Sequence, residues 1–176
     1  MMLSFLLALS WFTSLLASPL AGGRQGQEDA IHFQIVNAGL TVDGSLTGLT
    51  ATGQFDPAHL EQASVRASVP VGTIQTGIVL RDKHLQKPDY FDAEKYPTIT
   101  MQSIAFRKTG GEQYEGTFTL TMKGISHEVK LPFTVSPTHE LQGQFRINRL
   151  DYNLGKSSLI LANEVLITVK TRLGAS

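Results

Sequence analysis

The feature that most constrains the fold of this chain is a strict alternation of apolar and polar residues over its second half. It runs through residues 114–122, 127–135, 141–147 and 164–171. A period of two places every second side chain on the same face of a β-strand. Four strands, each with one apolar face, predict an antiparallel sheet that covers a core on one side.

Four further strands are expected in the first half of the chain, at residues 31–35, 45–55, 63–69 and 98–107. The second of them is the weakest, because Gly48 and Gly53 dilute its pattern. Turn residues predict a turn at residues 37–39 and a hairpin at Asp43-Gly44.

Residues 81–100 break the strand pattern. Apolar residues at roughly helical spacing between Ile78 and Gln86 predict a helix of about two turns. Pro88 ends this helix, because proline cannot continue the hydrogen-bond ladder. Turn residues then alternate with three aromatic side chains that favour burial, namely Tyr90, Phe91 and Tyr96. We therefore expect a packed corner over residues 78–97, which Arg81 and Asp82 fix as surface or capping residues.

Eight strands with one short helix between the third and the fourth predict an all-β fold. Most of the connections are short turns, so the strands follow a meander order. An antiparallel barrel and a two-sheet sandwich both fit this order, and the strand pattern alone does not separate them.

Several motifs resemble those of the YceI-like family of bacterial secreted proteins. They are Arg81-Asp82-Lys83-His84-Leu85, Tyr90-Phe91-Asp92, Glu94-Lys95-Tyr96-Pro97-Thr98-Ile99, Tyr114-Glu115-Gly116, Leu120-Thr121-Met122-Lys123-Gly124-Ile125, Phe145, Asn148-Arg149, Asp151-Tyr152 and Gly155. They cover most of residues 31–173 in the order of the family. The resemblance implies an eight-stranded, lipocalin-like antiparallel barrel that holds a long isoprenoid-type lipid, such as a polyprenyl chain or a quinone tail, in its lumen.

The segment before the last strand departs from the family pattern. Asn153 stands where members of the family commonly carry glycine, and asparagine tolerates a left-handed backbone next best. Arg149 and Asp151 are expected to pair and brace this turn, and a role at the barrel mouth is the less favoured alternative. The following insertion, residues 156–163, is short and apolar at residues 159–161, which either fold over the barrel mouth or shape its lining.

The amino terminus has the form of a secretory signal peptide. Residues 3–16 are largely apolar but too short to span a bilayer comfortably, and small residues follow them. We expect a signal peptide over residues 1–23 with cleavage near 21–23, a disordered leader over residues 24–29 and one barrel domain over residues 30–173. The protein would then be periplasmic or secreted. The alternative is an uncleaved membrane anchor, because Met1 and Met2 precede the run without a basic residue.

Composition excludes several classes of partner and chemistry. The formal net charge is zero and charged residues make up 17% of the chain, so no basic surface for nucleic acid is indicated. The chain has no cysteine, which excludes disulfides and thiol catalysis. The sequence leaves a homodimer open.

No pattern of polar residues indicates catalysis or a metal site. The five histidines are scattered, without the spacing of metal ligands. Asp82 and His84 are two positions apart, so on a helix they do not face each other. The chain also lacks a nucleophile elbow and a phosphate-binding glycine loop. We therefore predict a protein that is not an enzyme, with no catalytic residue, metal or cofactor.

The inward face of the barrel is the candidate ligand-binding site. Its members are Phe33, Ile35, Val65, Ala67, Met101, Phe118, Leu120, Met122, Leu131, Phe133, Phe145, Ile147 and Ile167. Ala67, Gly116 and Gly143 lie among them, which is compatible with an open lumen and with a filled core. An eight-stranded barrel either holds one small ligand or is filled by its own side chains. With the resemblance, we expect an isoprenoid-binding lumen. The alternative is a filled-core structural or protein-interaction module of the cell envelope, and a lipid hydrolase or isomerase is the least favoured hypothesis.

Overall fold

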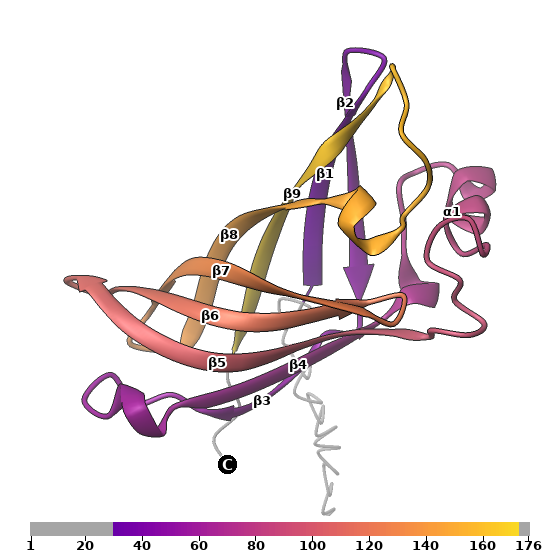
Figure 1. The fold of residues 1–176 in the computed structure, drawn as a ribbon. Helices are drawn as coiled ribbons and strands as arrows, with labels where there is room; N and C mark the ends of the chain where they lie inside the picture. The colour runs from indigo at the N-terminus through magenta and orange to yellow at the C-terminus, as the bar shows by residue number, and fades with distance from the viewer. Residues whose placement is uncertain (1–29, 173–176) are drawn as a thin grey trace, which may run out of the picture.

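The computed structural model describes residues 30–172. They form one antiparallel sheet of nine strands, which curls strongly around its own inner face (Figure 1). The strands are β1 (Ala30–Asn37), β2 (Leu40–Thr47), β3 (Thr50–Gln54), β4 (Ser64–Pro70), β5 (Thr98–Gly110), β6 (Gln113–Met122), β7 (Ile125–Val135), β8 (Glu140–Asn148) and β9 (Leu161–Arg172). Their order in the sheet is β2-β1-β9-β8-β7-β6-β5-β4-β3.

Four short helical elements connect the strands. They are the 3₁₀ turns η1 (Leu60–Gln62), η2 (Val71–Thr73) and η3 (Arg149–Tyr152), and the α-helix α1 (Val79–Leu85). The helix lies between β4 and β5, so the predicted all-β fold with one short helix in this position is confirmed. Among the described residues, none of the helices is long and apolar enough to cross a membrane.

The strand count differs from the predicted eight because the strand expected over residues 45–55 is two strands. Gly48, at φ +75°, lies between β2 and β3 and turns the chain where a side chain would be strained. The turn predicted at residues 37–39 is confirmed, with Ala38 and Gly39 both at positive φ.

The hairpin predicted at Asp43-Gly44 is wrong, because both residues lie inside β2. Gly44 is the register partner of Phe33 on β1. A Cβ atom at position 44 would overlap the Phe33 ring. This glycine therefore provides space for a neighbouring aromatic ring and does not turn the chain.

The two edge strands, β2 and β3, are not paired with each other in the sheet order. The curl is fastened at the end of β2, where Ser45 and Gln75 exchange two backbone hydrogen bonds of 2.9 Å each. Thr73 adds a side-chain link, since its hydroxyl accepts from the Thr47 amide at 3.1 Å. The first half of β2, from Leu40, extends past these hydrogen bonds.

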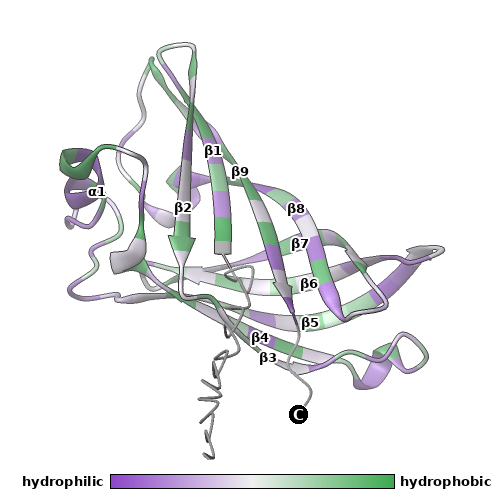
Figure 2. Ribbon diagram, turned by 180° about the vertical axis from the view of Figure 1, so that it is seen from behind, coloured by the Kyte–Doolittle hydropathy of each residue, from purple (hydrophilic) through white to green (hydrophobic). Residues whose placement is uncertain are grey.

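Apolar side chains from all parts of the sheet form one core on the inner face. Hydropathic colouring alternates along β1 and β8, as the period of two requires (Figure 2). Four aromatic side chains close one end of the sheet, and we call them the aromatic plug: Phe55, Phe106, Tyr114 and Phe133. The five pairs of rings in contact within the plug have centroids 5.1–6.0 Å apart.

Candidate functional site

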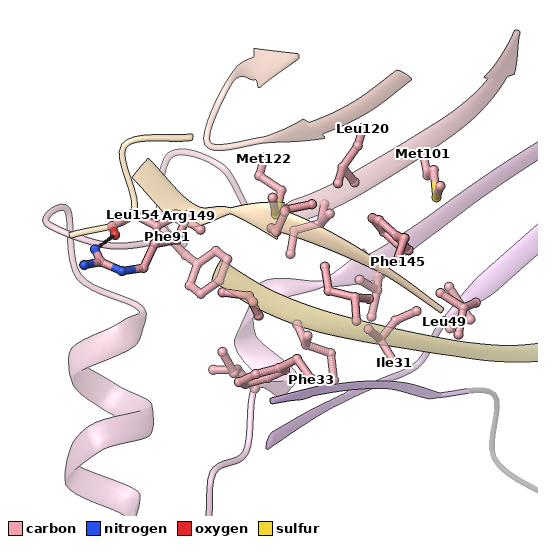
Figure 3. Close-up of a pocket in the computed structure, with 18 of the residues that line it drawn as sticks. Ile31, Phe33, Leu49, Phe91, Met101, Leu120, Met122, Phe145, Arg149 and Leu154 are labelled. Atoms are coloured by element: carbon pink, nitrogen blue, oxygen red, sulfur yellow. Dashed lines mark hydrogen bonds between the residues drawn. The ribbon is translucent and has the colours of Figure 1, made fainter. Parts of the chain in front are cut away.

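A cavity of about 340 Å³ lies inside the curled sheet (Figure 3). Its volume falls at the lower end of the roughly 300–1,000 Å³ range of small-molecule sites. Aliphatic, aromatic and methionine side chains make up most of its wall, and every strand contributes to it. The site is therefore suited to a slender apolar ligand.

The cavity reaches the surface at the end near α1. His84 both lines the cavity and is exposed, and Leu85 and Phe91 follow it on the inner side of the corner. Asn37 and Leu161 line the cavity from the ends of β1 and β9. We call this end the mouth. The aromatic plug lies beyond the other end and none of its four members lines the cavity.

Twelve of the thirteen predicted site residues line the cavity. They are Phe33, Ile35, Val65, Ala67, Met101, Phe118, Leu120, Met122, Leu131, Phe145, Ile147 and Ile167. Phe133 does not line the cavity. It is the next inward-facing residue of β7 after the lining residue Leu131, and it packs in the aromatic plug. That the twelve residues contact a ligand stays a prediction.

Sequence reasoning missed a second group of lining residues. Leu46 and Leu49 flank the break between β2 and β3, and both are buried. Phe91 comes from the corner and points into the cavity beside Leu154 and Arg149 (Figure 3). Leu46 and Leu49 are three positions apart, which does not fit the period of two of a continuous strand. This spacing could have indicated the break between β2 and β3, but a single strand was expected there.

Gly116 and Gly143 do not face open space. A Cβ at Gly116 would overlap the ring of Phe118, and one at Gly143 would lie 2.7 Å from Leu131 Cδ1. Neither glycine lines the cavity. Both allow a larger neighbour to lie flat against the sheet.

The corner is fastened through one threonine, as expected for Arg81 and Asp82. Thr76 donates to the Asp82 carboxylate from its amide at 2.9 Å and from its hydroxyl at 2.5 Å. The Arg81 guanidinium donates to the Thr76 hydroxyl at 2.7 Å and to its carbonyl at 2.5 Å. These bonds fix the start of α1 and turn Arg81, His84 and Leu85 toward the cavity.

Arg149 is buried at the mouth and is 3% exposed. Its guanidinium donates to the carbonyls of Leu154 at 2.7 Å, Lys156 at 2.8 Å and Ala162 at 2.9 Å. It also donates to Asn163 Oδ1 at 3.1 Å. The predicted pairing with Asp151 is wrong, because Asp151 is exposed while the arginine points inward to hold the insertion before β9.

The turn after η3 has the backbone that the sequence predicted. Asn153 is left-handed, with φ 53° and ψ 37°. Gly155 has φ +72° and packs against the Tyr90 ring, and its amide donates to the Asp89 carbonyl at 2.8 Å. This contact joins the corner to the insertion.

The apolar insertion divides between two environments. Leu161 lines the cavity, as one of the two alternatives proposed. Leu159 and Ile160 are exposed and do not line it. Neither alternative describes these two side chains.

Polar chemistry around the site is sparse. Burial raises the pKa of Tyr152 to about 12, and the charge of Asp151 adds to this shift. Tyr152 stacks edge-on against His127 outside the cavity lining, at a centroid distance of 5.0 Å. Within residues 30–172, no group of His, Asp and Glu side chains is arranged to hold a metal ion.

The fold and the cavity together define a lipocalin-like barrel with an apolar internal site. Residues 25–173 match the model of the YceI-like domain family, and the chain belongs to this family. The predicted signal peptide and leader lie outside the described residues.

Two curated relatives illustrate the sequence similarity. A UPF0312 protein of Pectobacterium atrosepticum is 29% identical over 119 residues, which cover 67% of this chain and 62% of that protein. A UPF0312 protein of Photorhabdus laumondii is 32% identical over 107 residues, which cover 60% and 55%. The chain thus spans less than two thirds of the length of the curated relatives it matches.

Solved structures share the fold. Burkholderia cenocepacia BcnA matches with a TM-score of 0.76 and 28% identity, over 81% of this chain and 94% of that chain. The YceI protein of Campylobacter jejuni matches with a TM-score of 0.65 and 25% identity, over 74% and 82%. A domain of Saccharophagus degradans, described as polyisoprenoid-binding, matches with a TM-score of 0.61 over 81% and 91%, and at 14% identity it shows the fold alone.

Proposed function

We propose that the protein binds and carries an isoprenoid-type lipid, a polyprenyl chain or a quinone tail, inside the cavity. The observation that carries this proposal is an apolar cavity of about 340 Å³ inside a barrel of the YceI-like family. The polyisoprenoid-binding description of a structural neighbour supports the same class of ligand. A filled core, the alternative from the sequence, does not account for this cavity.

Apolar burial supplies enough free energy for such binding. About three isoprene units carry about fifteen carbons, which at ~0.8 kcal/mol each gain ~12 kcal/mol. Association and ordering cost several kcal/mol. The remaining ~8 kcal/mol corresponds to micromolar affinity. Met101 and Met122 add flexible side chains that adapt to a methyl-branched chain.

The proposed orientation places the tail deep and the polar head group at the mouth. The deep part of the lining is aliphatic and aromatic, whereas Asn37, Arg81 and His84 line the mouth. The Arg81 guanidinium uses two of its nitrogens on Thr76, which holds it in place beside the opening. The corner then covers the entrance, and its opening would gate exchange.

We infer binding rather than catalysis, and a place outside the cytoplasm. The family membership and the character of its structural neighbours favour a binding protein. The apolar run at residues 3–16 supports export to the periplasm or beyond. A carrier there would shield a water-insoluble chain from water.

Native mass spectrometry of the exported protein, followed by organic extraction, tests the proposal. We expect one prenyl lipid or quinone per protein chain. A bare protein mass that shows no uptake of added polyprenol or quinone would refute lipid carriage and favour the interaction module. The same spectrum locates the amino terminus of the mature chain.

A further inference from the structure

We propose that the barrel docks on a lipid bilayer through a collar of exposed apolar side chains around the cavity mouth. The proposal rests on the proposed function, since it assigns the surface through which the lipid enters. The collar consists of Val36, Leu40, Ile78, Val79, Leu80, Leu159 and Ile160. Among the described residues these are seven of the eight large apolar side chains that are exposed, and the eighth is Ile104.

Three segments of the chain carry the collar residues. They are the β1–β2 hairpin, the start of α1 and the insertion before β9, which lie at the same end of the fold (Figure 1). The Ala38 amide donates to the Ile160 carbonyl at 2.7 Å and joins the hairpin to the insertion. The Gly155 amide joins the insertion to the corner through Asp89.

Each of the three segments also contributes to the inside of the mouth. Asn37 lies between Val36 and Leu40 in the hairpin and lines the cavity. Leu161 lines it directly after the two exposed residues of the insertion. The collar therefore adjoins the cavity lining directly, and from Ile160 to Leu161 the apolar surface continues from the outside of the molecule into the cavity, as a path for a lipid chain requires.

The opposite end of the barrel has the reverse character. Its connections include residues 56–59, 111–112 and 137–139, which are exposed and consist mainly of polar residues, glycine and proline. Ile104 projects from a bulge in β5, away from both ends of that strand. Exposed large apolar side chains thus concentrate at the mouth, although a water-soluble domain gains nothing from them there.

A bilayer is the occupant that these features fit best. Residues 36–40, 78–80 and 158–161 contain no charged side chain. Exposed Lys83 and Lys156 lie close by, and their long stems can follow the collar while the ammonium groups stay among lipid head groups. The collar consists of three separate protruding segments. A fluid bilayer can accommodate such segments because, unlike a folded protein partner, it does not need a complementary rigid surface. The cargo proposed for the cavity also dissolves in that phase.

An environment-sensitive fluorophore tests where the protein touches the membrane. The chain has no cysteine, so Leu159→Cys and the distant Glu112→Cys each give one labelling site. With vesicles of dioleoylphosphatidylcholine, we expect a blue shift and increased emission at position 159 and no change at position 112. The signal should persist from about 0.1 M to about 1 M salt, because apolar insertion is not screened as charge attraction is. Equal responses at both positions, or none at position 159, overturn the proposal.

A second measurement separates docking from binding. The collar variant Leu40→Ser/Leu80→Ser/Leu159→Ser should lower both partitioning to these vesicles and the rate of polyprenol transfer between vesicles by about tenfold or more. Its equilibrium loading from detergent should equal that of wild type. Ile104→Ser is the matched control and should change none of the three quantities. Unchanged partitioning in the collar variant, or wild-type self-association through the collar without vesicle binding, overturns docking on bilayers. Collar-dependent partitioning without any lipid loading upholds docking and refutes the carrier function alone.

Discussion

Replacing Ala67 with phenylalanine should block the cavity without unfolding the protein. Ala67 lies on β4 between its register partners Ala51 on β3 and Met101 on β5, and all three line the cavity. The substitution adds six carbons, about as many as one isoprene unit contains. The ring would therefore occupy the space of one unit of the ligand.

The expected loss of affinity follows from that displaced unit. Five carbons at ~0.8 kcal/mol each remove ~4 kcal/mol of binding free energy. This loss corresponds to roughly a thousandfold weaker binding. A ligand that shifts toward the mouth would lose less, so a factor between about thirty and a thousand is the expected range.

Stability should change in the opposite direction. The added ring leaves water and fills part of the cavity, so the free energy of unfolding of the empty protein should rise by roughly 1–2 kcal/mol. Ala105→Phe is the matched control, because Ala105 is exposed on β5. It should leave lipid affinity unchanged.

Calorimetric titration with a short polyprenol and denaturation in guanidinium chloride measure the two effects. The assignment of the cavity is refuted if folded Ala67→Phe protein binds the lipid as tightly as wild type. A loss of more than about 2 kcal/mol of stability would show instead that the site is already packed, because overpacking costs that much.

Three further predictions concern the structure that frames the cavity. Arg149→Met should lower the free energy of unfolding by about 3–5 kcal/mol in chemical denaturation, because it leaves several buried carbonyls without a donor. Gly44→Val should push the Phe33 ring into the cavity and weaken lipid binding in the same titration, with melting temperature as the check on folding. Burial raises the pKa of Tyr152 from 10.0 to about 12, so its protonated form is favoured in the folded state. The protonated phenol therefore contributes to folding stability, and this contribution is fully present below pH ~10. As the pH rises toward ~12 the contribution is lost, and the free energy of unfolding falls by roughly 2–3 kcal/mol. Tyr152→Phe should abolish this alkaline loss and leave neutral-pH stability equal or higher, since the Tyr152 hydroxyl has no partner among the described residues.

Alternation identified the inward faces of the strands but not the depth of each side chain along the barrel axis. Phe133 and Phe145 follow the same pattern, and only Phe145 lines the cavity. Depth depends on the stagger between neighbouring strands, which in this sheet includes the register shift in β5 between Ser103 and Ala105. A period of two carries no information about such stagger.

Long-range polar contacts were equally hard to predict. The turn at Asn153 followed from local backbone preference, and the structure has the expected left-handed residue. The backbone acceptors of Arg149 lie up to 13 positions away, at Leu154 and Lys156 before β9 and at Ala162 in its first residues. A nearby carboxylate such as Asp151 is the obvious partner in a sequence, whereas burial in the fold favours carbonyls that the chain wraps around the guanidinium.

The existence of a cavity depends on how large side chains lie against the wall of the sheet. Phe118 covers Gly116, and Phe33 covers Gly44, because each glycine leaves a flat place on the inner face. A Cβ atom at either position would force the ring toward the centre of the barrel. Inward glycines beside inward aromatic residues therefore keep rings against the wall and leave the lumen open. A filled core would favour side chains at those positions, so these pairs distinguish an open barrel from a packed one.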